Sequence, residues 1–219
     1  MKVLVEILGL PGAGKSTLLE RFTREHSILP ELLKPIVPSK ISVFKKLIQL
    51  VACLALSKPF ALLRLGSRRD GRWLLAKLAY RWAGLLQRPV GGLLWDSGLL
   101  QPLLSHAAEY SDRFVRIEDA LAVLNILPLP QAVIYLDSGV ETAYQRYCQR
   151  QELTGRRAGV KVTQAGFVQA QEICDHIVGM FPLQQVLRVN GVSDIGNGTL
   201  DEIAQRLFSW MNDTESRVK

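Results

Sequence analysis

Gly9-Leu10-Pro11-Gly12-Ala13-Gly14-Lys15-Ser16 is the stretch of this sequence that decides its fold. It satisfies the pattern G-x-x-x-x-G-K-S/T, in which glycines permit a tight loop and let the backbone approach an anion closely. The N–H groups of such a loop turn inward and form a concave anion site. A helix starting near Gly14 adds unpaired N–H groups and the positive end of its dipole. The stretch therefore predicts a loop that holds the phosphates of a nucleoside triphosphate.

The side chains at the end of this loop have separate expected tasks. Lys15 is expected to reach the β- and γ-phosphates, and Ser16 to bind magnesium. Thr17 offers a hydroxyl to the α-phosphate. The expected ligands are ATP and Mg²⁺. The expected nucleotide contacts are Gly9, Pro11, Gly12, Ala13, Gly14, Lys15, Ser16 and Thr17.

The flanks of the loop have the pattern that a phosphate-binding P-loop needs. Residues 3–8 form an apolar run typical of a buried parallel strand, and residues 14–25 are expected to be a helix. Further along the chain, short apolar runs alternate with segments of helical period. Expected strands are 91–95, 132–136 and 185–189, with a weak one in 27–37. Expected helices are 42–56, 71–87, 99–110, 112–127, 140–151, 162–179 and 199–211.

This alternation predicts an α/β fold, the three-layer sandwich of P-loop NTPases. Its parallel sheet would have about five strands with helices on both faces. The 219 residues suit a single domain, 1–219. Within it we expect a helical insertion on the substrate side at about 40–90 and a lid at about 146–159.

Composition narrows the class of protein. Hydrophobic residues make up 48% of the chain, enough for a core, and the net charge is +7, which suits phosphate-bearing ligands, nucleic acid or an anionic membrane. The three scattered cysteines favour neither a disulfide framework nor a zinc site, and they fit a reducing, cytoplasmic compartment. The apolar run 41–56 contains Lys45 and Lys46 and falls short of the roughly 20 residues that span a bilayer.

Several segments resemble the thymidylate kinase and deoxynucleoside kinase group. They are residues 6–17 (EILGLPGAGKST), 94–101 (LWDSGLLQ) and 134–150 (IYLDSGVETAYQRYCQR), together with 189–191 before the last helix. The resemblance implies a P-loop kinase, in which the loop containing Asn190 lies near the adenine. Residues 32–89, where that group builds its acceptor pocket, carry no such resemblance, so the phosphate acceptor stays open.

The segment after the expected strand 132–136 resembles the arginine-bearing lid of those kinases. Arg146 and Arg150 are four residues apart and share a helix face. Arg156 and Arg157 follow in a loop with glycines on both sides. Guanidinium groups on a closing lid would neutralise the phosphoryl group in transfer. The alternative is an exposed helix with solvated arginines. One departure from the group is Glu152, where a further arginine is common.

Acidic residues near expected strand ends are a second group of candidates. Asp96 would hold magnesium through water or accept the proton of an attacking hydroxyl, and the alternative is a turn aspartate. Asp137, followed by Ser138 and Gly139, favours a turn and helix-cap role. Glu31 lies near the position of a base glutamate in deoxynucleoside kinases, but a solvated loop residue is the favoured interpretation.

A basic stretch separates the first two helices of the expected insertion. Arg64, Arg68, Arg69 and Arg72 would hold an acidic small-molecule acceptor, rest on anionic lipid or form a solvated face. Trp73 and Trp82 lie among leucines at helical spacing and predict core packing.

Four functions compete for these observations. The first is a small-molecule kinase that moves the γ-phosphoryl of ATP to a hydroxyl or phosphate acceptor. A GTPase would need an N-K-x-D tetrapeptide, and a transport ATPase an LSGGQ-like signature, and the sequence has neither. A non-catalytic or membrane-associated ATP-binding regulator remains the alternative. We expect no specific nucleic-acid binding, and contact with a membrane surface and a homodimer both stay open.

Overall fold

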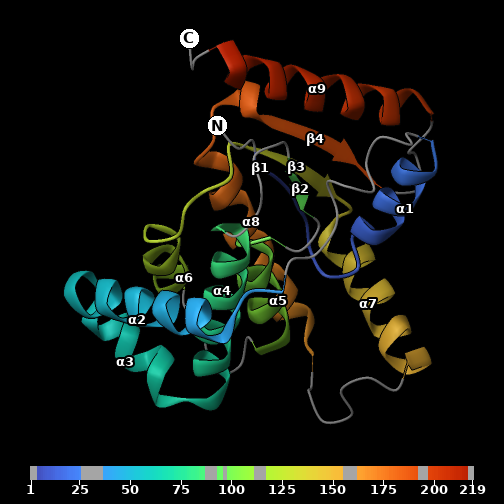
Figure 1. The fold of residues 1–219 in the computed structure, drawn as a ribbon. Helices are drawn as coiled ribbons and strands as arrows, with labels where there is room; N and C mark the ends of the chain where they lie inside the picture. The colour runs from blue at the N-terminus through green and yellow to red at the C-terminus, as the bar shows by residue number, and fades with distance from the viewer. Residues whose placement is uncertain are drawn as a thin grey trace.

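A parallel β-sheet lies at the centre of the chain, which a computed structural model describes over residues 4–25, 37–86, 93–95, 98–110, 117–154, 162–191 and 197–216. Figure 1 shows the sheet between two layers of helices. The strands are β1 (Leu4–Leu8), β2 (Leu93–Trp95), β3 (Ala132–Asp137) and β4 (Val186–Asn190). The helices are α1 (Lys15–Glu25), α2 (Lys40–Ser57), α3 (Pro59–Ser67), α4 (Arg69–Leu86), α5 (Gln101–Tyr110), α6 (Ile117–Leu124), α7 (Val140–Thr154), α8 (Gln164–Gly179) and α9 (Asn197–Ser216), with a short 3₁₀ turn, η1 (Leu183–Gln185).

The strand order is β2-β1-β3-β4, and every described pair is parallel. In register, Glu6 lies opposite Trp95, and Leu8 lies opposite Tyr135. Because all four strands run the same way, their carboxyl ends meet at one edge of the sheet. Ligands bind at this edge in open parallel sheets.

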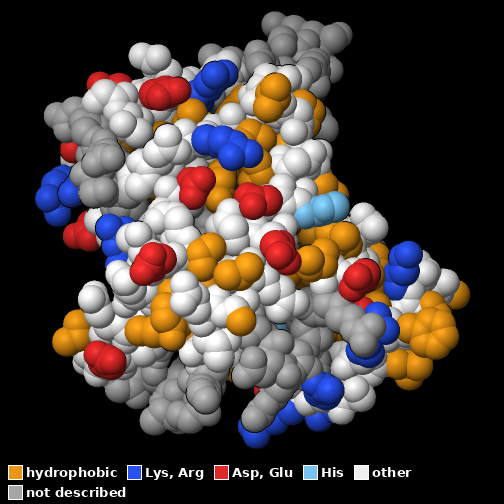
Figure 2. Space-filling view, turned by 180° about the vertical axis from the view of Figure 1, so that it is seen from behind, with side chains coloured by type: hydrophobic (Ala, Val, Ile, Leu, Met, Phe, Trp, Pro, Cys, Tyr) orange, Lys and Arg blue, Asp and Glu red, His pale blue; other side chains and the backbone are white. Residues whose placement is uncertain are grey.

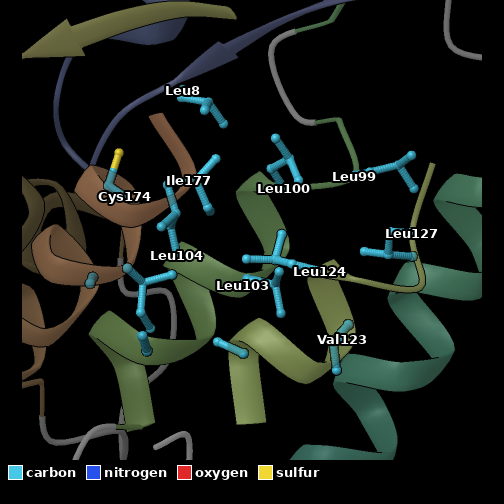
Figure 3. Packing of buried hydrophobic residues seen from close by; sticks show 14 of the residues in the cluster. Leu8, Leu99, Leu100, Leu103, Leu104, Val123, Leu124, Leu127, Cys174 and Ile177 are labelled. Atoms are coloured by element: carbon cyan, nitrogen blue, oxygen red, sulfur yellow. The ribbon is translucent and has the colours of Figure 1, made fainter. Parts of the chain in front are cut away.

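Side chains of β1 alternate between the two helical layers. Val5 and Ile7 belong to a core with α1 and α9, whereas Leu4 and Leu8 face a larger core that contains α5, α6 and α8. Figure 3 shows leucines of α5 and α6 meeting Ile177 of α8 close to Leu8. The expected three-layer α/β fold is confirmed. The described residues form four strands, and most of the expected strand at 27–37 lies outside them.

The helical layer before β2 contains one helix that the sequence analysis does not predict. α3 (Pro59–Ser67) falls inside the supposed basic stretch. Pro59 occupies its first turn, where the missing N–H costs nothing, and Ala61 and Leu65 are buried. Both α2 and α3 pack on α4. In the described part of the chain, no helix combines the length and apolar character needed to cross a bilayer.

The two tryptophans of α4 have different environments. Trp82 is buried, and the Lys46 ammonium lies 4.5 Å from the centre of its ring. Trp73 is 48% exposed, so its predicted core position is wrong. The buried face of the helix is set by Leu74, Leu75 and Leu78. Trp73 lies just outside that face, where its ring instead contacts Lys77.

Candidate functional site

The glycine loop joins β1 to α1 at the carboxyl edge of the sheet and packs against two other elements. Gly12 has φ +89°, and a Cβ there would lie 2.3 Å from the carbonyl oxygen of Ala143 in α7. A Cβ on Gly9 would lie 2.8 Å from the carbonyl oxygen of Leu136 in β3. Neither position has room for a side chain, and the first also requires a backbone conformation that favours glycine. The two glycines therefore hold the loop against β3 and the start of α7.

Lys15 is the charged group of this loop. It begins α1, and its Nζ donates to the carbonyl oxygens of Gly9 at 2.8 Å and Leu10 at 2.9 Å. The ammonium group is thereby held over the loop. Ser16 and Thr17 follow in the first turn of α1, and both are exposed. The predicted contacts from Gly9 to Thr17 thus lie together at a helix N-terminus, where unpaired N–H groups favour an anion.

Pro11 and Ala13 shape the loop from within. Both are buried, and Ala13 belongs to the core between β1 and α1. The Ala13 N–H donates to the Leu10 carbonyl oxygen at 3.0 Å, which closes a turn. These two residues support the loop conformation, and only their backbone remains to meet a ligand.

α7 carries the two lid arginines that the structure describes. Arg150 is exposed, with its guanidinium 5.8 Å from the centre of the Tyr147 ring, and Arg146 is half-buried. The Tyr147 hydroxyl donates to Glu109 of α5 at 3.0 Å, which anchors the helix. The start of α7 contacts the glycine loop, so this helix projects from the phosphate site. Arg156 and Arg157 lie outside the described residues.

Glu6 organises the turn that follows β2. Its buried carboxylate accepts hydrogen bonds from the N–H groups of Leu99 at 3.0 Å, Leu100 at 2.9 Å and Gln101 at 2.9 Å. A Cβ on Gly98 would lie 2.4 Å from this carboxyl group, so only glycine fits there. The carboxylate caps the N-terminus of α5 and ties it to the strand that leads into the glycine loop.

Burial dominates the acid–base behaviour of Glu6. Desolvation raises the pKa of its carboxyl group to about 7, although the three N–H hydrogen bonds and the positive charge of Arg81 act in the opposite direction. The sequence analysis missed this role. The available signal was a single acidic residue within an apolar strand.

The predicted acid Asp96 lies outside the described residues. It follows Trp95, which pairs with Glu6 in the sheet register, so it comes directly after the strand beside β1. Glu31 also lies outside the described residues.

The carboxyl ends of β3 and β4 supply two further predicted residues. The Asp137 carboxylate accepts a hydrogen bond from the Gly139 N–H at 3.2 Å, just before α7 begins. This geometry fits the turn role expected for Asp137. The Gly191 N–H donates to the Asp137 carbonyl oxygen at 2.7 Å. Asn190 ends β4 at the same edge with an exposed side chain.

Arg64 and Arg72 of the basic stretch make contacts within the fold. Arg64 forms a two-pronged ion pair with the fully buried carboxylate of Asp119 in α6, with Nε to Oδ2 at 2.8 Å. Arg72 donates to the carbonyl oxygen of Gly66 at 3.0 Å. Arg64 therefore joins α3 to α6, and it is committed to a structural contact.

A parallel sheet in which β1 runs through a glycine loop into α1 is the α/β fold of P-loop NTPases. Solved structures of deoxyadenosine kinase from M. mycoides share this fold with the chain. The structure with bound dATP matches at a TM-score of 0.55 and 16% identity, over 94% of this chain and 98% of that chain. The structure with bound dCTP matches at 0.53 and 17%, over 95% and 100%. The structure with products dCMP and a flexible dCDP matches at 0.51 and 18%, over 95% and 99%.

The chain matches no protein-family profile and no curated protein sequence. At 16–18% identity, the structural likeness establishes the fold.

Proposed function

We propose that this chain is an ATP-dependent phosphotransferase, a small-molecule kinase of the nucleoside or nucleotide kinase kind. It transfers the γ-phosphoryl group to a hydroxyl or phosphate acceptor. The observation that carries this proposal is the glycine loop at the carboxyl edge of the sheet, with Lys15 held over it at a helix N-terminus. This arrangement suits a polyphosphate because backbone N–H groups and one ammonium group converge on the same place.

The residues near the loop fit a magnesium ion. The exposed Ser16 hydroxyl lies in the first turn of α1, and Asp96 directly follows the neighbouring strand. Oxygen ligands of this kind suit Mg²⁺, which neutralises charge on the phosphate oxygens when bound. In this proposal Asp96 either holds that ion through water or accepts the proton of an acceptor hydroxyl.

The lid residues would act on the moving phosphoryl group. Phosphoryl transfer needs mainly positioning and charge neutralisation, which guanidinium groups from Arg146, Arg150 and Arg156 would supply. The contact between Gly12 and α7 supports this role, because it brings the arginine-bearing helix to the phosphate loop. Asn190, at the end of β4, would lie beside the adenine.

The structural neighbour and the charges of this chain narrow the class of molecule that would accept the phosphoryl group. The M. mycoides enzyme with the same fold is a deoxyadenosine kinase, which favours a nucleoside acceptor. A nucleotide acceptor, as in thymidylate kinases, or another acidic small molecule would need cations. Arg68 and Arg69, whose side chains are exposed, are candidates for that task. A homodimer belongs to the same proposal, since twofold dimers are the commonest soluble oligomers.

A γ-labelled ATP transfer screen against nucleosides, nucleotides, sugars and lipid-linked sugars tests the proposal. We expect label on one acceptor class, and loss of both ATP binding and transfer in Lys15→Ala, measured by calorimetry and label transfer. Arg24→Ala, on the exposed side of α1, is the matched control and should behave like the wild type. Unchanged ATP affinity in Lys15→Ala would refute the site.

The alternative function is a non-catalytic ATP-binding regulator. It would bind ATP through the same loop and label no acceptor. Asp96→Asn distinguishes the two, because this change should abolish transfer by a kinase but leave a regulator's ATP binding and function intact.

A further inference from the structure

The two helices α2 and α3 expose a row of large apolar side chains. On α2 they stand at 41, 44, 48 and 56, spaced by three, four and eight positions, so they lie on the same side of the helix. Leu56 is 88% exposed and Phe60 is 73% exposed, values that are unusual for residues of this size in ordered helices. We define the α2–α3 face by its exposed apolar residues, Ile41, Phe44, Ile48, Leu56, Phe60 and Leu63.

This face points away from the rest of the molecule. The opposite side of α2 buries Leu50 and Leu54, and α3 buries Ala61 and Leu65. Both helices place those buried sides on α4. Large apolar side chains exposed on two neighbouring helices indicate an interaction site.

The same helices carry only positive charge. Residues 37–69 contain seven Lys and Arg and no Asp or Glu, in a chain whose whole net charge is +7. Lys45 lies between the exposed apolar positions of α2, and Lys58 lies at the junction of the two helices; both are exposed. Figure 2 shows hydrophobic side chains beside Lys and Arg at the end of the molecule that α2 and α3 occupy. The basic residues are Lys40, Lys45, Lys46, Lys58, Arg64, Arg68 and Arg69.

We propose that the α2–α3 face docks on the surface of an anionic lipid bilayer. Phenylalanine, isoleucine and leucine side chains would enter the boundary between headgroups and acyl chains, while exposed basic side chains such as Lys45 and Lys58 meet anionic headgroups. Arg64 stays paired with Asp119. The positive charge of α2 and α3 favours an anionic lipid surface over other partners. A second copy of the chain, docked through the same face about a twofold axis, would bring like charges together. A nucleic acid would pair with the positive charges but would not cover the apolar side chains of the α2–α3 face.

Vesicle co-sedimentation of the purified full chain tests the proposal. We expect binding to phosphatidylcholine vesicles containing about 30 mol% phosphatidylglycerol to exceed binding to pure phosphatidylcholine by roughly tenfold or more. Binding should weaken when salt rises from about 0.1 M to about 0.5 M, because the ionic part is screened. The readout needs neither ATP nor an acceptor, so it stands independently of the proposed kinase activity.

Two double variants separate the apolar and ionic parts. Phe44→Ser with Phe60→Ser should lower anionic-vesicle binding by about tenfold or more, because it removes the inserted side chains. Lys45→Glu with Lys58→Glu should lower it by a similar factor and abolish the salt dependence. All four side chains are exposed, so thermal melts followed by circular dichroism should stay at the wild-type midpoint.

The matched control is Phe208→Ser with Arg206→Glu on α9. Phe208 is 49% exposed, Arg206 is exposed, and Figure 1 places α9 on the far side of the sheet from α2 and α3. This control should bind vesicles like the wild type. The proposal is overturned if the wild type binds neutral and anionic vesicles equally or neither, or if the control loses as much binding as the α2–α3 variants. A third outcome would also overturn it. In that outcome, light scattering shows that the wild type is a dimer and the Phe44→Ser, Phe60→Ser variant a monomer, while the wild type binds no vesicles.

Discussion

At the scale of single residues, two glycines decide where the phosphate loop lies. The backbone of Gly12 touches α7, and that of Gly9 touches β3. A glycine with positive φ but open surroundings offers a comparison. Gly139 has φ +70° and would place a Cβ in open space. Comparing Gly12 with Gly139 therefore separates the cost of close contact from the cost of backbone strain.

Gly12→Ala should lower the free energy of unfolding by roughly 2 to 4 kcal/mol, because it adds a clash with α7 to the strain of a positive φ. Gly139→Ala should cost only about 1 kcal/mol, since strain alone acts there. Urea denaturation of both variants measures the difference. Equal losses would show that the loop moves away from α7 without cost.

Glu6 and His106 give this protein two opposing pH dependences. Burial raises the pKa of Glu6 to about 7, so between pH 4.5 and 7 the folded state binds more protons there than the unfolded state. That contribution to stability is complete below pH 4.5 and is lost as the pH rises towards 7. Burial lowers the pKa of His106 to about 4, with Asp70 raising it and Lys77 lowering it further. Its contribution is present above pH 6.5 and is lost as the pH falls towards 4.

The contributions of Glu6 and His106 can each be measured as the free energy of unfolding of the wild type minus that of a variant. The stability of the wild type minus that of Glu6→Gln should fall by about 3 kcal/mol from pH 4.5 to 7. The wild type minus His106→Asn should instead rise by about 3 kcal/mol from pH 4 to 6.5. Urea denaturation across this pH range provides both curves. A Glu6→Gln difference that does not change with pH would contradict the buried, proton-binding carboxyl group.

At the scale of elements, α7 connects the phosphate loop to the proposed lid. Its start is held by Gly12, its middle is anchored by the bond from Tyr147 to Glu109, and Arg150 lies beyond this anchor with an exposed side chain. In the proposed kinase, this arginine would act on the moving phosphoryl group. Its effect should therefore appear mainly in the transition state.

Arg150→Ala should lower kcat by roughly ten- to a hundredfold and change KM much less, because the lid charge acts on the moving phosphoryl group. Steady-state kinetics with the acceptor found by the transfer screen provide the measurement. Arg206→Ala on α9 serves as a control for loss of an exposed arginine. Equal losses in kcat and in ATP affinity would contradict the proposal that Arg150 acts as part of a lid.

At the scale of the whole molecule, the helical layer of α2, α3 and α4 is joined to the α/β core. Leucines of these helices are part of the core beneath β1, and the pair of Arg64 with Asp119 links α3 to α6. The Asp119 carboxylate is fully buried while Arg64 is partly exposed. Removing the cation would leave a buried charge without its partner.

Arg64→Met should therefore lower the urea midpoint of unfolding, and the double variant Arg64→Met with Asp119→Asn should recover part of the loss, because the neutral amide is cheaper to bury. Arg69→Met, which changes an exposed arginine at the start of α4, is the control and should leave the midpoint unchanged. A double variant less stable than Arg64→Met would contradict this account.

The local parts of this architecture could be predicted from the sequence. The strand of residues 4–8, the glycine loop and the helix from Lys15 are consecutive, and their dihedral needs and apolar period are properties of neighbouring residues. The same holds for β3, whose expected bounds differ from the observed ones by one residue at one end, and for β4, where they differ by one residue at each end. α3 was missed because Arg64 and the arginines that follow the helix suggested a surface stretch, whereas Ala61 and Leu65 are buried and give the helix its apolar contacts.

The contacts that complete the site depend on the folded chain. Glu6 and the N–H of Leu99 are 93 residues apart, and Arg64 and Asp119 are 55 apart. No local pattern pairs such residues, because their free energy comes from burial and from the geometry of packed layers. The amino-acid order thus specified the glycine loop between β1 and α1, since that loop is built from adjacent backbone groups. Packing alone chose which helix touches it, which carboxylate caps α5 and which apolar side chains of α2 and α3 stay in water.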